Sequence, residues 1–342
     1  MKNKYSVLSV LALLGSSSAF AQSSVTLYGR VNTTVERQDV GGLKTTVVNN
    51  NSSRFGFKGV EDLGGGLKAG FELESGFQSD TGGSGALFNR QSEVNLSGRF
   101  GTVRLGNFFP ASYYASADYI SMHNHDTGSS SDALYYDPVW LGGLGTSNTI
   151  GYRSPNIGGF TAEAAVVLHE QPSNTGGKNG YDFAANYAIG ALDLGAGYSS
   201  VNSNNQFSLR ALYSFGQLTV AGYYQRNKDA NQFLPTGAGT RNNLRLAAAY
   251  KIGASEFHVN VGRAGEYENV VNSEATQYTL GYNYNLSKRT KVYGYYTRVE
   301  NKSGAGGNLD VINPARDVAA CHWNFAPQTS PLPVPHFAAI GC

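Results

Sequence analysis

Strict alternation of apolar and polar side chains is the main pattern along this chain. The stretch VTLYGRVNTTVE (25–36) has apolar or small residues at every odd position and polar residues at every even one. Successive side chains of a β-strand point to opposite faces, so such a strand has one apolar and one polar face. Similar alternation recurs at 67–74, 160–168, 256–262 and 278–284. The sequence therefore predicts an all-β protein.

Short and long connections take turns between the predicted strands. The short ones contain the Gly, Asn and Ser residues of tight turns, and they lie at 61–66, 98–101, 155–159, 190–191, 216–217, 253–255 and 287–290. The long ones run roughly over 37–51, 76–89, 109–147, 169–179, 200–206, 226–242 and 264–275. Seven hairpins, the strand at 25–36 and one partner make sixteen antiparallel strands. An even strand number with alternating short turns and long loops is typical of an outer-membrane β-barrel. The alternative, a soluble β-sandwich, usually has short loops at both ends.

The charged residues predict which face of the sheet meets lipid. An Arg or Lys on the lipid face at mid-membrane costs about 2–4 kcal/mol. Eight such placements would exceed a typical folding stability of about 5–15 kcal/mol. The polar face is therefore expected to line a wet lumen, and the apolar face is expected to meet lipid. The cations on the polar face are Arg30, Arg54, Lys58, Lys68, Arg104, Arg153, Arg210 and Arg245, and the acids are Glu36, Glu72, Glu74, Glu93, Glu163, Asp182, Asp193 and Glu256.

The N-terminus has the features of a secretory signal peptide. Lys2 and Lys4 precede an apolar core over 7–14, and Ala19-Phe20-Ala21 fits a small-residue cleavage site. We expect Sec export with cleavage after Ala21. No later apolar run approaches the ~18 residues of a spanning helix. The chain has 22 tyrosines, which are typical of the aromatic girdles at the two membrane interfaces. Its net charge is only +2, which gives no reason to expect nucleic acid as a partner.

Several motifs together resemble the general porins of Gram-negative β-proteobacteria of the Bordetella, Burkholderia and Neisseria kind. They are SSRFGFKGVEDLGGGLKAGFELESGF (52–77), FNRQSEVNLSGRFGTVRLGN (88–107), YRSPNIGGFT (152–161) and YNLSKRTKVYGYY (284–296). The resemblance implies a sixteen-stranded barrel in the outer membrane that passes small hydrophilic solutes by diffusion. It also implies a homotrimer, contact with outer-membrane lipid and lipopolysaccharide, and assembly by the barrel-assembly machinery.

The resemblance further implies that the third external loop folds into the lumen and narrows it. The connection at 108–147 is far longer than the others, and long loops in compact domains are usually functional. We expect a pore constriction with a basic wall opposite loop acids, and a weak anion preference, because strand charges are fixed while loop acids can move. Each charge could instead be a solvated group with no special role. The expected wall residues are Arg30, Arg54, Arg90 and Arg104, and the expected loop acids are Asp118, Asp126 and Asp132.

Two positions of this wall depart from a simple pattern. Arg90 belongs to the NRQ motif, but its parity matches the lipid-facing Val94 and Leu96. It therefore needs a bulge or a position above the membrane to reach the lumen. Where the family commonly has Arg and then Asp, this chain has Gly151 and Arg153.

Other functions have weaker support in the sequence. The HNHD stretch (123–126) has metal-like composition but no apparent third ligand, and no other cofactor motif is present. We expect no enzyme, because none of the six histidines shows a recognisable pairing with Ser and an acid. A receptor or adhesin barrel remains the alternative to a porin, with a barrel enzyme behind it.

The C-terminal segment 308–342 departs from the family. It holds five of the ten prolines and both cysteines, and it ends at Cys342 instead of the terminal Phe that the family typically carries. Pro removes donors from a β-ladder. We therefore expect a signal peptide over 1–21, a barrel over 22–307 with fifteen recognisable strands, and an atypical tail in place of the closing strand. A divergent closing strand over 317–326 is the alternative.

Overall fold

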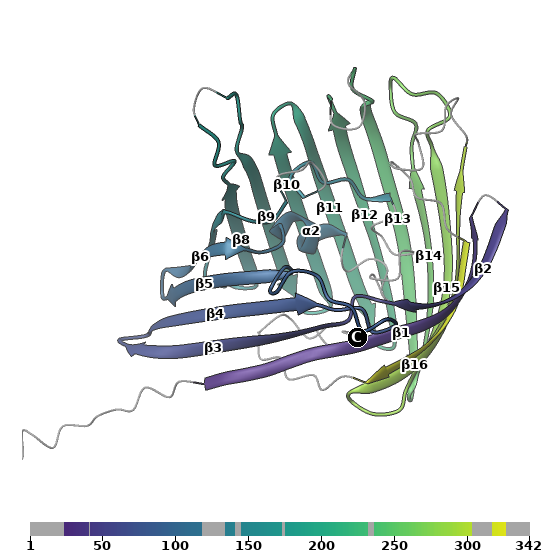
Figure 1. Cartoon of the computed structure of the whole chain (residues 1–342), viewed down its shortest axis with the longest axis horizontal. Helices are drawn as coiled ribbons and strands as arrows, with labels where there is room; N and C mark the ends of the chain where they lie inside the picture. The colour runs from purple at the N-terminus through teal and green to yellow at the C-terminus, as the bar shows by residue number, and fades with distance from the viewer. Residues whose placement is uncertain are drawn as a thin grey trace, which may run out of the picture.

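The computed structural model describes residues 24–40, 42–117, 134–140, 145–172, 175–231, 236–302 and the backbone of 317–325. These residues form one antiparallel sheet and, among the described residues, one short helix (Figure 1). The elements are β1 (Ser24–Val40), β2 (Leu43–Asn50), β3 (Arg54–Gly64), β4 (Leu67–Gly76), β5 (Gln91–Gly98), β6 (Gly101–Asn107), α2 (Ala111–Ser116), β7 (Thr149–Arg153), β8 (Phe160–Val167), β9 (Gly180–Ile189), β10 (Leu192–Val201), β11 (Asn204–Phe215), β12 (Leu218–Asp229), β13 (Gly239–Ile252), β14 (Ser255–Ala264), β15 (Ala275–Asn285), β16 (Thr290–Asn301) and β17 (Asp317–Phe325).

The sheet closes on itself as a sixteen-stranded barrel. Each strand from β3 to β17 pairs with the next along the chain, and β1 pairs with β17 on one side. On its other side β1 pairs with β3 through its first half and with β2 through its second half. Strands β2 and β3 therefore occupy one position in the ring, interrupted at 51–53. Closure leaves no sheet edge for lipid to meet, which a membrane barrel requires.

The seven predicted short turns are confirmed, but two of the predicted long connections are wrong. The segment at 37–51 is a β-hairpin, because β1 continues to Val40 and β2 follows after two residues. The segment at 200–206 contains only a two-residue turn between β10 and β11, with Asn202 in the left-handed region at φ 54°. Asn tolerates that conformation better than most residues. The barrel wall therefore rises further on its loop side than the alternation alone suggests.

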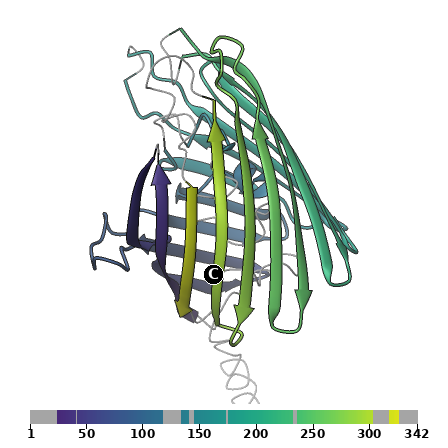
Figure 2. The same cartoon turned by 90° about the vertical axis from the view of Figure 1, so that its right-hand side faces the viewer.

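Strand β17 occupies the closing position, where the sequence predicts a missing or atypical strand. Its backbone pairs with β1 from Val31↔Phe325 to Asp39↔Asp317 and with β16 from Thr290↔Phe325 to Thr297↔Val318 (Figure 2). This pairing corresponds to the divergent closing strand over 317–326, the alternative to an atypical tail at that position. A Pro-free run separates the prolines at 314 and 327, so a ladder can form between them.

The apolar face of the sheet points outward, as predicted. On β1 the large exposed apolar side chains are Val25, Leu27, Val31 and Val35, whereas the buried side chains are Arg30, Asn32, Thr34 and Glu36. Two aromatic bands mark the limits of the outer apolar surface. The band toward the loops includes Phe183, Tyr198, Phe207, Tyr224, Tyr278 and Tyr296, and the band toward the short turns includes Tyr187, Tyr213, Phe215, Tyr250, Phe257 and Tyr282.

Candidate functional site

Neighbouring strands of one wall bring two of the predicted arginines together on a shared glutamate. Arg54 lies at the start of β3, and its Nε is 3.5 Å from Glu74 Oε1 on β4. Arg90 Nε donates to the same oxygen at 2.6 Å. Arg90 comes one residue before β5, after Phe88 at φ 56°. This irregular backbone interrupts the alternation of side chains before β5. The Arg90 side chain therefore lies on the polar face, although the alternation alone places it on the apolar face.

Arg30 performs a different task from Arg54, although the two are paired residues of β1 and β3. Its guanidinium is buried, and its Nε and Nη2 donate to the carbonyl oxygens of Ser52 and Asn51 at 3.1 and 3.2 Å. These carbonyls belong to the interruption between β2 and β3, where the ladder cannot satisfy them. Arg30 therefore stabilises the break in the wall, and Arg54 is the more exposed charge of the pair.

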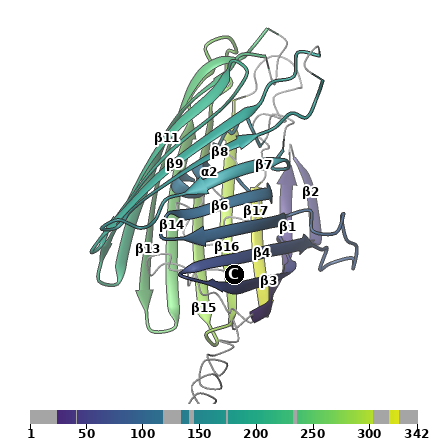
Figure 3. The same ribbon diagram turned by 90° about the vertical axis from the view of Figure 1, so that its left-hand side faces the viewer.

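Arg104 on β6 anchors a second charged group, whose members come from β5 to β8. Figure 3 shows β6, β7 and β8 side by side in the wall. Its Nη2 is 2.5 Å from Glu93 Oε2, and its Nη1 is 3.6 Å from Glu163 Oε2. Arg153 Nε lies 2.8 Å from the other oxygen of Glu163. The Arg104 guanidinium also stacks on Phe108, 4.0 Å from the ring centroid, and a Cβ at Gly151 would meet the same ring at 3.0 Å. The glycine in place of the family's Arg thus leaves room for Phe108.

Like charges as well as opposite charges are neighbours on this wall, since Arg30 pairs with Arg54 and Glu72 pairs with Glu93 across strands, and cations outnumber acids in the set named below. Lys58 and Glu72 complete the set, with Tyr28 donating to Glu72 Oε1 at 2.7 Å. Pairing holds the arginine side chains in place, since charge-assisted hydrogen bonds to carboxylates are strong and directional. An excess of positive charge remains on the wall. The cations are Arg30, Arg54, Lys58, Arg90, Arg104 and Arg153, and the acids are Glu72, Glu74, Glu93 and Glu163.

The start of the predicted constriction loop lies against the inner face of the opposite wall. Helix α2 packs on β9, β10 and β11 (Figure 1). The backbone N–H of Ser112 donates to Asp182 Oδ1 at 3.0 Å, and its hydroxyl donates to the other oxygen of that carboxylate. A Cβ at Gly195 would stand 1.8 Å from the carbonyl oxygen of Ala115. The glycine at 195 is therefore what lets the helix touch the strand.

A second part of the loop, 134–140, is held to the same wall. Asp137 Oδ1 accepts from the backbone N–H groups of Val139 and Trp140 at 2.9 and 3.0 Å, and Ser199 donates to its other oxygen. The Gln225 amide on β12 pairs with both backbone groups of Tyr136. Burial raises the pKa of the Asp137 carboxyl, and these N–H donors offset part of the shift. The loop is thus fixed at both described ends.

The predicted loop acids Asp118, Asp126 and Asp132 lie outside the described residues, as does the HNHD stretch at 123–126. The four arginines predicted for the wall fall into two groups: Arg30 pairs with Arg54 across β1 and β3, Arg54 and Arg90 share Glu74, and Arg104 lies apart from them with Glu93 and Glu163. Within the part of the chain that the structure describes, no three His, Cys, Asp or Glu side chains come together as metal ligands.

Sequence reasoning missed the counterions and the loop anchors. It placed Glu74, Glu93 and Glu163 on the lumen face, but parity does not say which arginine each one meets. Ser112 and Asp137 carried no signal before the loop position was known. The alternation places Asp182 on the lumen face near the loop end of β9. That position is the one sequence signal that points to a contact with the loop.

Glu74→Gln is expected to increase the anion-to-cation permeability ratio by a few fold. The substitution removes the charge that Arg54 and Arg90 share but keeps a hydrogen-bond acceptor. A unit charge at 4 Å is worth about 1 kcal/mol in water, which is about fivefold in an equilibrium. Zero-current potentials of the variant and of the parent in a salt gradient measure the change. A ratio that falls would contradict the assignment of this group to the pore.

Known sequences match almost the whole barrel. The profile of the family described as Gram-negative porin matches residues 7–304. The chain is 32% identical to outer membrane porin protein 32 of Delftia acidovorans, over 88% of this chain and 91% of that one. It is 31% identical to the major outer membrane protein P.IB of Neisseria gonorrhoeae over 49% of each chain.

Solved structures share the same architecture. The anion-selective porin from Comamonas acidovorans superposes with a TM-score of 0.70 at 27% identity, covering 90% of this chain and all of that one. OmpF of Salmonella typhi superposes with a TM-score of 0.67 at 14% identity, covering 89% of this chain and 97% of that one. The second likeness concerns the fold alone.

Proposed function

Because the chain belongs to the Gram-negative porin family and forms an outer-membrane channel, we propose that its pore is narrowed between a basic wall and the loop 108–147. The wall consists of Arg30, Arg54, Arg90 and Arg104, and the opposing acids are Asp118, Asp126 and Asp132. Water-filled pores of this kind pass small hydrophilic solutes and ions by diffusion.

The observation that carries the proposal is the positive excess on a rigid wall. Glu74 is an ion-pair partner of both Arg54 and Arg90. Glu163 is likewise a partner of both Arg104 and Arg153. The arginine side chains of barrel strands that form ion pairs keep a fixed position, whereas charged side chains on a loop can move. Fixed charges at the narrowest point set ion preference. We propose a weak preference for anions, and the likeness to the Comamonas porin, which is described as anion-selective, supports this sign.

Graded sugars in a liposome swelling assay test the pore itself. A diffusion pore admits small sugars and excludes large ones, so the swelling rate should fall steadily with sugar size. A receptor or adhesin barrel, or a barrel enzyme, would give no swelling with any sugar. Lack of swelling by a correctly folded, heat-modifiable preparation would contradict the proposed channel.

Three further features of the proposal concern assembly. We propose that the mature chain begins after Ala21, that three copies form a homotrimer, and that the barrel-assembly machinery inserts them. One structural neighbour is described as a trimer form. A heat-sensitive band at three times the mature mass on unheated gels would support the homotrimer, and a strictly monomeric species in detergent would contradict it.

Arg54→Ala is expected to move ion selectivity toward cations by a few fold. The substitution leaves Glu74 with one arginine instead of two, so the wall loses one positive charge while its acids remain. Arg54→Lys is the matched control, because it keeps the charge and should keep the selectivity. Zero-current potentials measure both variants. Equal selectivity of Arg54→Ala and the parent would show that Arg54 does not face the constriction.

A further inference from the structure

Two parts of the long loop share a cluster of aromatic side chains. The ring of Phe109, two residues after β6, lies 5.3 Å from the Trp140 ring and 6.3 Å from the Tyr114 ring, measured between centroids. Tyr113 lies 5.4 Å from both Tyr114 and Trp140. The ring planes meet at 61° to 75°, the edge-to-face arrangement that aromatic pairs prefer. We call Phe109, Tyr113, Tyr114 and Trp140 the aromatic cluster.

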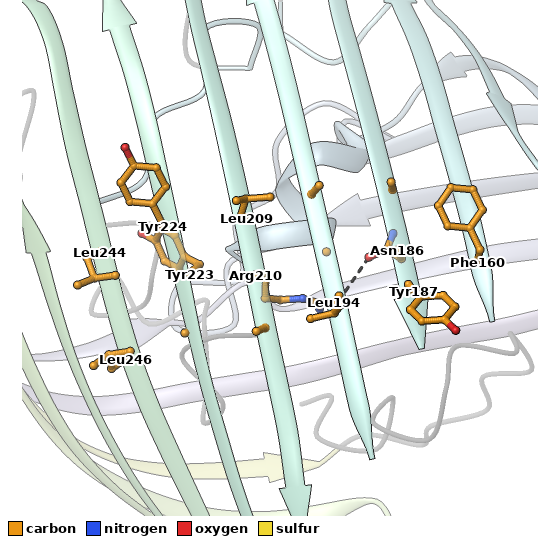
Figure 4. Close-up of a pocket in the computed structure, with 15 residues that line it drawn as sticks. Phe160, Asn186, Tyr187, Leu194, Leu209, Arg210, Tyr223, Tyr224, Leu244 and Leu246 are labelled. Carbon is orange, nitrogen blue, oxygen red and sulfur yellow. Dashed lines mark hydrogen bonds between the residues drawn. The ribbon is translucent and has the colours of Figure 1, made fainter. Parts of the chain in front are cut away.

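One side of the aromatic cluster faces the lumen. Helix α2 packs on the inner face of β9, β10 and β11, and Figure 4 shows it behind these strands, on the side away from the outward-facing Leu194 and Leu209. Tyr113 is buried, whereas Tyr114 is 44% exposed. Because the helix lies inside the barrel, the exposed part of Tyr114 faces the lumen. Phe109 beside it is half-buried, so aromatic rings form part of the pore lining.

The aromatic cluster adjoins the first group of wall charges. Arg90 Cζ is 6.0 Å from the centroid of the Phe109 ring, within the range of a cation–π contact. Arg90 directly precedes β5 and Phe109 follows β6, and these two strands pair up to that end. Arg90 and Arg54 share Glu74, and their side chains remain 24% and 22% exposed. Aromatic rings and partly exposed guanidinium groups therefore lie next to each other.

We propose that the aromatic cluster and the two arginines form a binding site in the pore for small aromatic carboxylates, of which benzoate is the simplest. This inference rests on the proposed basic wall. The ring of the solute stacks on Tyr114 and on the exposed part of Phe109, with about 4.5–7 Å between ring centroids. Its carboxylate accepts charge-assisted hydrogen bonds from the guanidinium of Arg90.

The charge beside the rings selects an anion. Aromatic faces also attract cations, but the charged group that contacts Phe109 is Arg90, and Glu74 is already paired with two arginines. A carboxylate loses favourable hydration when it leaves water, and a cation at the site offsets that loss. An aliphatic carboxylate gains only the ionic contact, and an aromatic cation gains only the ring contact. The site therefore favours a solute that has both features.

Block of the channel current by two carboxylates tests the site. Benzoate or cyclohexanecarboxylate is added to assembled channels in potassium chloride, and the concentration that halves the current is measured for each. The two anions have the same charge and similar size, but cyclohexanecarboxylate is more apolar and has no π face. Apolar attraction alone therefore predicts that cyclohexanecarboxylate binds more tightly. The proposed site predicts that benzoate blocks at about fivefold lower concentration, the effect of one aromatic contact.

Variants assign this preference for benzoate to the cluster. Tyr114→Leu combined with Phe109→Leu should abolish the preference, because leucine keeps an apolar side chain but has no ring. Tyr296→Leu is the matched control: Tyr296 is 49% exposed, but it lies on the outer face of β16, so its variant should keep the fivefold preference. Arg90→Gln should weaken the block by both carboxylates about fivefold and leave their ratio unchanged. Heat-modifiable mobility confirms that each variant is assembled.

Three results would overturn the proposal. They are equal half-blocking concentrations of the two carboxylates in the parent, an unchanged preference in the double variant, and equal binding of benzoate and benzylammonium.

Equilibrium binding of the same compounds to the detergent-solubilised, assembled protein separates this site from the proposed channel. A parent that prefers benzoate in the binding measurement but does not conduct would contradict the channel alone. A parent that conducts but shows no preference would contradict the site alone.

Discussion

Removal of residues 115–134 is expected to raise the single-channel conductance severalfold. The described ends of the loop are anchored to the inner wall through Ser112 and Asp137, so the segment between them starts and ends inside the barrel. The rings of Tyr113 and Tyr135 are 5.5 Å apart. A short Gly linker can therefore join the two ends without moving either anchor. Planar bilayer recordings of single channels measure the effect.

A variant with full loop length separates pore size from charge. Asp118→Asn, Asp126→Asn and Asp132→Asn together remove the proposed loop acids but keep every residue in place. This variant should shift selectivity toward anions with little change in conductance, whereas the deletion should change both. Unchanged conductance in a correctly folded deletion variant would show that the loop does not narrow the pore.

Truncation after Lys302 is expected to abolish the assembled barrel. The truncation removes β17, which pairs along nine residues with β1 and along eight with β16. Both neighbours would then present unpaired backbone groups to lipid, at several kcal/mol each. That cost exceeds a typical folding stability of about 5–15 kcal/mol. Outer-membrane yield of heat-modifiable protein measures the outcome.

Truncation after Phe325 is the matched control. It removes residues 326–342 but keeps every strand pair of β17. The shortened chain would also end in Phe, as the family that the sequence resembles typically does. We expect its yield to equal or exceed that of the full chain. Assembly of both truncated chains would show that β17 does not close the barrel.

The alternation of side chains predicted the membrane-spanning part of the fold but not the part above it. Spanning strands must be apolar outside and polar inside, so they leave a period of two in the sequence. The hairpin of β1 and β2 rises toward the loops, where Arg37 and Lys44 face outward into water. Without lipid the outer face need not be apolar, and the alternation disappears from 43–50.

The candidate site was predictable by face but not by partner. Parity put Arg54, Arg104 and Glu74 on the lumen side, and the structure agrees. Which charged side chains form ion pairs depends on the stagger between strands and on the length and direction of each side chain. Neither can be read from the alternation in a single sequence. Arg90 shows a second limit, because the backbone irregularity at Phe88 reverses its parity. The loop anchors needed the fold before they could be recognised.

The zero-current potential of the parent protein in a potassium chloride gradient is the sharpest test of the proposed basic wall. We expect a channel whose potential has the sign of a modest anion preference, because the wall cations outnumber the glutamates with which they pair. A clear cation preference, recorded from correctly assembled channels, would contradict the assignment of Arg30, Arg54, Arg90 and Arg104 to the controlling wall of the pore.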